Sequence, residues 1–273
     1  MKIDIMSGNG NIFAVIDNRH YQYSKEYYSK NIDKIYQRKY FDNLNFEGLL
    51  VINENVKNDF EVWYYNPDGS SGMMCGNGGR CAVRYAFDNN FTDQQEINFL
   101  MSGNIYKSKI NNDTIELYFS YPERIDYNLE ILIDNQLIIG DFINNGSVHF
   151  VINMDALPIN DFNSDELFEF ARKIRYNIKF PNGTNVNFYR KEGNIYLIKT
   201  YERGVENFTG ACGTGTLATA ISINYQLNEK FPMTFLPPSG EKLFVNAIIN
   251  DCKIDKLILE GHTKYINTYN VEI

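Results

Sequence analysis

The sequence predicts a duplicated chain in which two similar halves each combine strands with helices. A small polar turn that leads into a strand-like run occurs twice, as SGNGNIFAVID at 7–17 and as NGSVHFVINMD at 145–155. A cysteine followed by a glycine-rich turn also occurs twice, in MMCGNGGRC at 73–81 and in GACGTGTL at 210–217. Turn residues before an apolar run are typical of a strand entry, so both halves are expected to begin alike.

The spacing of these repeats supports the duplication. When the two turn segments are superposed, Asn11 falls on Ser147. Cys75 then lies 64 positions after Asn11, and Cys212 lies 65 positions after Ser147. The superposition also pairs an aromatic residue of the first half with a histidine of the second, Phe13 with His149.

A helix is expected after the first strand of each half. In the second half, NSDELFEFARKIRYN at 163–177 begins with Asn163, which can cap a helix, and Glu166 follows three positions later. Its apolar residues share one helical face: Leu167, Phe170, Ala171 and Ile174. The first half has the same period more weakly, at Ile32, Ile35 and Tyr36.

Two more strand-like runs lead to each cysteine. They are FEGLLVINE at 46–54 and EVWYYN at 61–66 in the first half, and TNVNFYR at 184–190 and NIYLIKTYE at 194–202 in the second. Their β-branched and aromatic residues favour strands.

The segment after each cysteine has a helical period, so each thiol is expected at a helix N-terminus. The predicted buried faces are Cys81, Ala82, Tyr85 and Ala86 in one helix, and Leu217, Ala220, Ile221 and Tyr225 in the other. Backbone N–H groups and the positive end of the dipole favour an anion there, and the same field lowers the pKa of a thiol. Such a turn can bind a carboxylate and activate a thiolate together.

Composition excludes several classes of function. The 273 residues carry 26 basic and 34 acidic side chains, a formal net charge of −8, so no basic surface for nucleic acid is expected. No secretion signal is recognised, and no segment reaches the roughly 20 apolar residues of a membrane span. We therefore expect a cytoplasmic protein with no nucleic-acid or membrane partner. Four cysteines without a C-x-x-C pair predict neither a disulfide scaffold nor a zinc site.

Two such turns brought face to face would hold two thiols on opposite sides of one small ligand. That arrangement inverts a carbon centre, because one thiolate removes the proton and the opposite thiol supplies another. The N–H donors would hold the charge that develops on the carboxylate. A dinucleotide site is disfavoured because Ala218 stands where a third glycine is needed, and no phosphate-loop motif is present.

At these residues the chain resembles the diaminopimelate epimerase family. The resemblance rests on NPDGSSGMMCGNGGRC at 66–81, ERGVENFTGACGTG at 202–215, the opening SGNGNIFAVID, and LPPSGEKLFV at 236–245. It implies an α+β fold of two pseudo-symmetric domains, each a mixed β-sheet wrapped around a central helix, with the active site in the cleft between them. The expected domains are 1–120, with 264–273 returning to the first, and 121–263.

The resemblance also implies an isomerase of lysine biosynthesis that interconverts LL- and meso-diaminopimelate with two cysteines and with neither pyridoxal phosphate nor metal. By position, Cys75 and Cys212 would be acid and base, with His149 and Glu202 as their polar partners. The donors to the reacting carboxylate would be Gly76, Asn77, Gly213 and Thr214. The contacts to the distal end of the substrate would be Asn11, Asn66, Asn185, Glu202 and Arg203. Cys81 and Cys252 are left as structural thiols.

One departure from the family pattern leaves alternatives open. Ser147 stands where the family usually has a substrate-binding asparagine, so Ser147 is expected to bind substrate with a shorter reach. A racemase or dehydratase of a smaller amino acid, such as proline or hydroxyproline, is the second hypothesis. A non-catalytic binding or thiol-redox protein, with Cys75 and Cys212 paired, is the third. A homodimer is left open.

Overall fold

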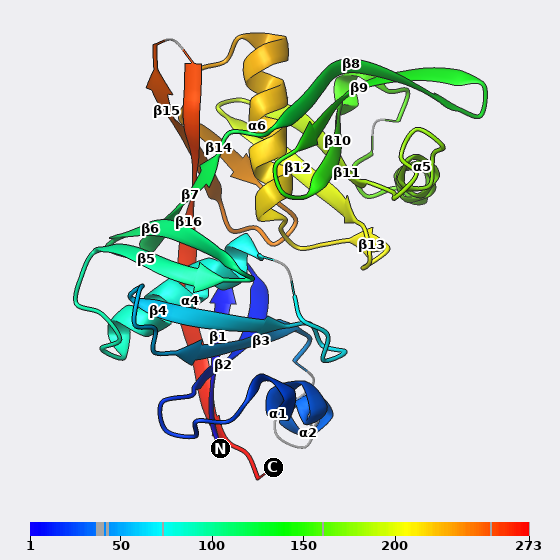
Figure 1. Ribbon diagram of the computed structural model, residues 1–273. Coiled ribbons are helices and arrows are strands. Elements are labelled where there is room, and N and C mark those ends of the chain that lie inside the picture. Colours follow the sequence, from blue (N-terminus) through cyan, green and yellow to red (C-terminus); the bar gives the residue numbers. More distant parts are fainter. Residues whose placement is uncertain (37–40, 42–43, 73, 160, 252, 273) are drawn as a thin grey trace. The chain divides into compact units, whose positions relative to one another are not determined.

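A computed structural model of the chain describes residues 1–36, 41, 44–72, 74–159, 161–251 and 253–272. It consists of two compact units (Figure 1). Unit 1 comprises Met1–Phe119 and Glu260–Ile273, and unit 2 comprises Ser120–Leu259.

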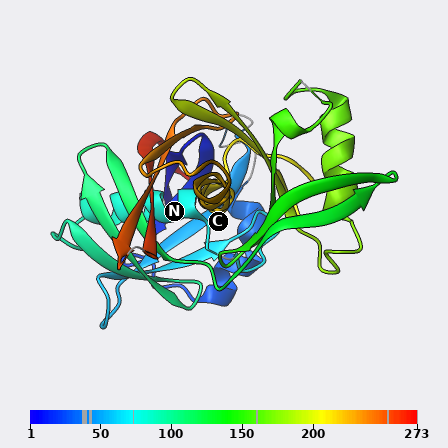
Figure 2. The same ribbon diagram turned by 90° about the horizontal axis from the view of Figure 1, so that it is seen from above.

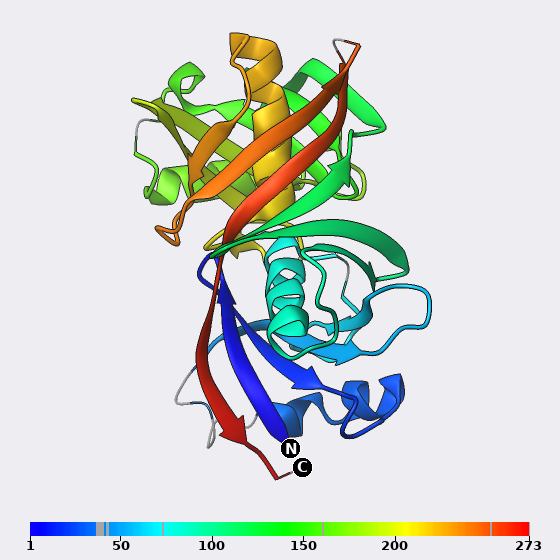
Figure 3. The ribbon, with the colours of Figure 1, turned by 90° about the vertical axis from the view of Figure 1, so that its left-hand side faces the viewer.

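Unit 1 is a sheet built around one helix. Its strands are β1 (Lys2–Gly8), β2 (Asn11–Asp17), β3 (Phe46–Asn53), β4 (Phe60–Tyr65), β5 (Glu96–Met101), β6 (Asn104–Asn111) and β7 (Thr114–Ser120), which ends at the unit boundary. The helices of unit 1 for which bounds are described are α1 (Lys25–Lys30), α2 (Ile32–Ile35) and α4 (Gly76–Asp88). The strand order runs from β1 to β7 and returns to β1 through β16 (Lys253–Asn270). Helix α4 packs against β1, β2, β3 and β6, and Figure 3 shows it beside the strands.

Unit 2 repeats this design with an open sheet. Its strands are β8 (Arg124–Ile133), β9 (Gln136–Asn144), β10 (Val148–Asn153), β11 (Asn185–Glu192), β12 (Ile195–Glu202), β13 (Asn207–Phe208), β14 (Met233–Leu236), β15 (Leu243–Asn250) and the start of β16. Its helices are the short η1 (Met154–Ala156), α5 (Asp165–Arg175) and α6 (Gly213–Leu227). Helix α6 packs against β9, β10, β11 and β15. The β8–β9 hairpin forms a long two-stranded ribbon, green in Figure 2.

The two units have the same sequence of strand pairings, which confirms the predicted duplication. Along β1 to β6 of unit 1, neighbouring pairs alternate antiparallel, parallel, antiparallel, parallel, antiparallel. Along β9, β10, β11, β12, β14 and β15 of unit 2, the alternation is identical. Helices α4 and α6 connect equivalent parallel strands. The predicted α+β class, with a mixed sheet around a helix in each half, is therefore confirmed.

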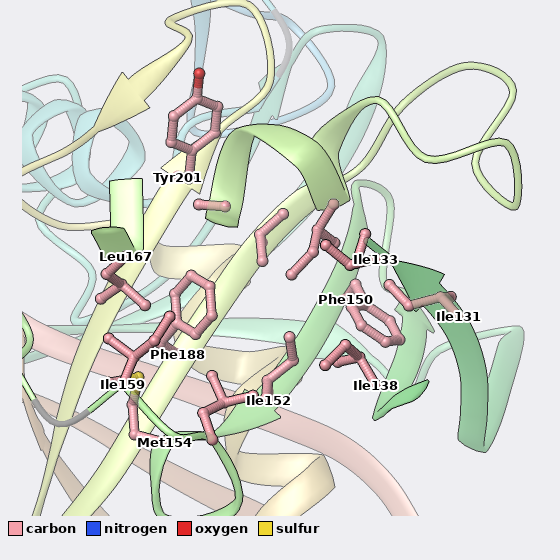
Figure 4. Packing of buried hydrophobic residues seen from close by; sticks show 14 of the residues in the cluster. Ile131, Ile133, Ile138, Phe150, Ile152, Met154, Ile159, Leu167, Phe188 and Tyr201 are labelled. Carbon is pink, nitrogen blue, oxygen red and sulfur yellow. The ribbon is translucent and has the colours of Figure 1, made fainter. Parts of the chain in front are cut away.

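One hydrophobic cluster of unit 2 packs between the sheet and α5, and Figure 4 shows part of it, including Phe150 and Phe188. Leu167, Ala171 and Ile174 of α5 are fully buried, and Phe170 is partly buried against them, as predicted. The predicted cap is wrong: the side chain of Ser164, not that of Asn163, accepts the hydrogen bond from Leu167 N.

Helix α6 differs from the prediction at one position. Leu217, Ala220 and Ile221 are buried, whereas Tyr225 is 52% exposed. The Tyr225 ring stacks on that of Tyr127, with centroids 3.6 Å apart, so it lies outside the core. Among the described residues no helix combines the length and apolarity needed to span a membrane.

Candidate active site

The two cysteine turns have nearly the same backbone. Cys75 is the N-cap of α4, with φ −108° and ψ 116°, and Cys212 is the N-cap of α6, with φ −116° and ψ 111°. The Cys75 carbonyl accepts from Gly79 N at 2.7 Å, and the Cys212 carbonyl accepts from Thr216 N at 2.9 Å. Both cysteines are half-buried. The prediction that each thiol stands at a helix N-terminus, where the first N–H groups have no partner within the helix, is confirmed.

Beneath the second turn, four polar side chains form a continuous chain of contacts. Cys212 Sγ lies 3.6 Å from Thr214 Oγ1, which lies 3.1 Å from His149 Nε2. On the other side of the ring, Asn187 Nδ2 lies 3.0 Å from His149 Nδ1. The sequence prediction placed His149 near a cysteine, and unit 2 connects it to Cys212 through the Thr214 hydroxyl.

His149 is neutral in this environment. Its side chain is fully buried, and burial lowers its pKa from 6.5 to about 3, because a protonated ring would lose its hydration. The positive charge of Arg203 acts in the same direction. At neutral pH the ring therefore carries one N–H and one bare nitrogen.

The side chains beneath the second turn pack so closely that position 215 must be a glycine. A Cβ at Gly215 would lie 2.6 Å from Asn187 Oδ1, 3.0 Å from Thr200 Oγ1 and 3.3 Å from Cys212 Sγ. The glycine lets α6 approach the side chains of β11 and β12 that face it.

The side chains beneath the first turn, which we call its floor, are the apolar Phe13 and Leu50. A Cβ at Gly78, the equivalent of Gly215, would lie 3.1 Å from Phe13 Cε1 and 3.3 Å from Leu50 Cδ2. Phe13 pairs with Gly48 across β2 and β3, just as His149 pairs with Asn185 across β10 and β11.

Two residues further along β3 and β11 stand Leu50 and Asn187. Phe13 and Leu50 therefore occupy in unit 1 the places of His149 and Asn187 in unit 2.

The first turn has its polar contacts on another side. Arg80 Nη2 donates to Asn77 Oδ1 at 2.6 Å and to Asn9 Oδ1 at 2.7 Å. Arg80 is fully buried, so its guanidinium fixes the side chain of Asn77 within the cysteine turn. Asn11, at the start of β2, is also buried.

Asn185 connects three segments of unit 2. Its amide nitrogen donates to Ser147 Oγ and to Val148 O, both at 2.9 Å, and its oxygen accepts from Arg203 N at 2.8 Å. The Arg203 guanidinium donates to Asn182 O at 3.3 Å. The amide of Asn185 is thus engaged in placing Ser147 and Arg203.

The remaining predicted residues lie in their own local contacts. Glu202 Oε1 accepts from Thr209 Oγ1 at 2.5 Å at the end of β12. Asn66 donates from Nδ2 to Ser70 Oγ at 2.9 Å within the turn after β4. Gly76 and Asn77 begin α4, and Gly213 and Thr214 begin α6. Cys252 lies outside the described residues.

Sequence reasoning missed two polar residues of this region, Asn187 and Arg80. Asn187 lies two positions after Asn185 on the same strand, and this spacing puts both side chains on one face of the sheet. Arg80 lies three positions after Asn77, one helical turn away. Within the part of the chain that the structure describes, no group of three His, Cys, Asp or Glu side chains is placed to hold a metal ion.

Comparison with known proteins identifies the family. The family model of diaminopimelate epimerase matches residues 4–121 and 143–247. A diaminopimelate epimerase of Aquifex aeolicus is 34% identical over 253 residues, covering 88% of each chain. Among solved structures, a phenazine biosynthesis protein of the PhzF family from Enterococcus faecalis superposes with a TM-score of 0.72 at 12% identity, covering 100% of this chain and 99% of that one.

A hydroxyproline epimerase from Agrobacterium vitis has a TM-score of 0.67 at 13% identity, with coverage of 99% and 92%. These two structures share the fold at low identity, whereas the family model and the relative from Aquifex match the sequence itself. The resemblance seen in the sequence is thereby confirmed: the chain belongs to the diaminopimelate epimerase family.

Proposed function

We propose that this chain is an isomerase that interconverts LL-diaminopimelate and meso-diaminopimelate in lysine biosynthesis. The observation that carries the proposal is the pair of cysteine turns with matching backbones, each at the N-terminus of a buried helix, in a chain of this family. Each half supplies one thiol and one set of N–H donors.

The proposed mechanism inverts one α-carbon between two thiols. The thiolate of one cysteine removes the α-proton as the C–H bond breaks, and the electron pair passes toward the carboxylate. The thiol of the other cysteine then gives its proton to the opposite face of the carbon. The backbone N–H groups that begin α4 and α6 hold the carboxylate while its charge grows; they belong to Gly76, Asn77, Gly213 and Thr214.

This mechanism requires Cys75 and Cys212 to flank the same carbon. We expect the reacting carbon of the substrate to present one face to each thiol. Glu202 and His149 would tune the thiols, and Asn11 and Asn66 would complete the walls of the site.

Substrate choice would depend on the second amino acid group of diaminopimelate. Arg203 offers paired N–H donors, which suit the distal carboxylate better than the point charge of a lysine. Asn185 binds both the Arg203 backbone and the Ser147 hydroxyl, so Ser147 would take part in the same recognition of the distal group. We expect the enzyme to work in the cytoplasm without pyridoxal phosphate or a metal ion.

The test is turnover of defined isomers. Purified protein is incubated with LL-diaminopimelate, and the isomers are followed by chiral chromatography. Conversion to the meso form is expected, with no racemisation of lysine, proline or hydroxyproline. Efficient turnover of proline in place of diaminopimelate would favour the smaller-substrate hypothesis, for which the short Ser147 side chain is the specific observation. Absence of turnover, with a Cys75–Cys212 disulfide in the native protein, would favour the thiol-redox hypothesis.

Arg203→Lys sharpens this test. Because a lysine lacks the paired donors, we expect a loss of about 10-fold or more in kcat/KM for diaminopimelate. The matched control is Arg172→Lys on α5, where the exposed arginine pairs with the exposed Glu169 on the same helix. Equal effects of the two substitutions would contradict the proposed role of Arg203.

A further inference from the structure

The polar chain under Cys212 ends at a residue with no role in the proposed mechanism, Asn187. The side chain is fully buried, and its amide nitrogen faces His149 Nδ1. Its amide oxygen, Oδ1, is buried and makes no hydrogen bond within the described part of the chain. An unsatisfied buried acceptor costs stability and calls for an explanation. The equivalent residue in unit 1 is Leu50, so the architecture of the turn does not itself require an amide at this place.

The direction of each hydrogen bond follows from the chemistry of the groups. An amide nitrogen only donates, so Nδ1 of His149 must accept from Asn187. A neutral imidazole has one N–H, and with Nδ1 accepting, that N–H must lie on Nε2. Nε2 therefore donates to Thr214 Oγ1, and the Thr214 hydroxyl is left to donate its own proton toward Cys212 Sγ.

From this arrangement we infer that Asn187 is a positioning residue: it holds His149 in the tautomer that turns the Thr214 hydroxyl into a hydrogen-bond donor to the Cys212 sulfur. A donor at this place stabilises the thiolate over the thiol. The opposite tautomer would turn Nε2 into an acceptor and draw the Thr214 proton away from the sulfur. The inference deepens the proposed function, on which its meaning for catalysis rests.

Several charged and titratable groups lie on the elements around this chain of contacts. Arg203 is the charge that acts on His149. Glu202 is engaged with Thr209. On the sheet side of α6, Asp141 of β9 accepts from Ser222, which is also the side-chain partner of Tyr189 of β11. Ser222 is ten residues from Cys212, or about 15 Å along the helix.

The test measures the titration of the Cys212 thiol without substrate. The rate of iodoacetamide alkylation of Cys212 is followed against pH by peptide mass spectrometry in the full-length protein. Asn187→Leu installs the residue of the equivalent place in unit 1, and we expect the midpoint for Cys212 to rise by about one pH unit. Cys75 in the same samples is the internal control, and its midpoint should stay unchanged. An unchanged Cys212 midpoint overturns the inference.

Asn187→Asp keeps the shape of the side chain and reverses its chemistry. A carboxylate accepts from Nδ1–H and imposes the opposite tautomer, so we expect a rise at least as large as in Asn187→Leu. An unchanged midpoint would overturn the inference. This variant also provides the measurement if Asn187→Leu does not fold.

A double-mutant cycle separates the hydrogen-bond relay from a general disturbance of the site. Thr214→Val removes the hydroxyl through which Asn187 acts, and alone it should raise the midpoint of Cys212 by a similar amount. Asn187→Leu in that background should then add nothing. Additive shifts would contradict a relay. Because the readout needs no diaminopimelate, a protein that fails to epimerise it but follows these shifts would refute the proposed function and leave the inference intact.

Discussion

The two cysteine turns have nearly the same backbone dihedral angles, but the side chains packed beneath them differ: they are apolar in unit 1 and polar in unit 2. In both, the cysteine caps a helix and a glycine three residues later allows close packing. Below Gly78 lie Phe13 and Leu50, and below Gly215 lie polar side chains of β11 and β12. The backbone geometry of the turn is thus the same in both halves. The few residues beneath each turn determine which groups surround its thiol.

The largest expected loss of activity follows replacement of either of the two thiols. Cys75→Ala and Cys212→Ala should each lower turnover of diaminopimelate by about 10³-fold or more, because inversion needs a group on each face of the carbon. Cys81→Ala is the control, since this buried thiol lies on the side of α4 that faces Gly8. Steady-state epimerisation by chiral chromatography is the measurement. A single-cysteine variant that retains the parent rate would refute the two-thiol mechanism.

A smaller loss of activity is expected when a polar side chain beneath the second turn is replaced by its apolar equivalent from the first. His149→Phe installs the aromatic residue of unit 1 and interrupts the chain from Asn187 to Thr214. Without the ring, the Thr214 hydroxyl is no longer oriented, and we expect kcat to fall about 10- to 100-fold. Urea unfolding of the same variant checks that the fold is retained. A folded variant within twofold of the parent rate would show that the polar floor does not serve catalysis.

The same substitution should change how stability depends on pH. The folded protein keeps His149 neutral down to about pH 3, whereas the unfolded chain protonates it below about 6.5. Between these values the unfolded state binds more protons, so the parent loses free energy of unfolding as the pH falls, by about 1.4 kcal/mol per pH unit from this group. His149→Phe lacks this loss. Urea unfolding at pH 7.5, 6.0 and 5.0 tests it, and parallel stability curves would contradict it.

The smallest expected effect is on stability, when each of the two equivalent glycines is replaced by alanine. In Gly215→Ala, the new methyl group meets Asn187 Oδ1 at 2.6 Å, and that side chain is held by His149. We expect a net destabilisation of about 1–2 kcal/mol after the gain in helix propensity. In Gly78→Ala, the nearest contacts are 3.1 Å and longer, so the change should stay within about 1 kcal/mol. Chemical denaturation measures both, and a larger loss in Gly78→Ala would reverse the comparison.

The parts of the fold that follow from local signals were predicted from the sequence. The repeated turns and the spacing to each cysteine predicted two similar halves, and the glycine-rich segments predicted helices that begin at Cys75 and Cys212. The roles of the candidate site residues stay predictions. Local patterns could not choose between Asn163 and Ser164 as a cap, because both side chains are competent and only the backbone path decides.

The contact between His149 and Asn187 beneath the second turn could not be predicted from the sequence for a different reason. The contact between His149 and Asn187 joins neighbouring parallel strands, and its register depends on the whole sheet. An asparagine in a strand pattern also has a common structural explanation, as Asn185 illustrates by holding strand ends together. Tyr225 was misplaced because its helical period continues past the end of the core.

The closure of unit 1 through β16 has a consequence for how the chain is made. Strand β1 pairs along its length with the end of β16, from Lys2 opposite Asn270 to Gly8 opposite Thr263, and Val271 N donates to Met1 O at 2.8 Å. During synthesis the ribosome releases unit 2 before Glu260–Ile273 emerge. The first unit to be translated is therefore the last able to complete its sheet, and β1 must wait for its partner through the synthesis of more than 200 residues. Until that partner arrives, one edge of β1 stays unpaired and is exposed to chaperones and proteases.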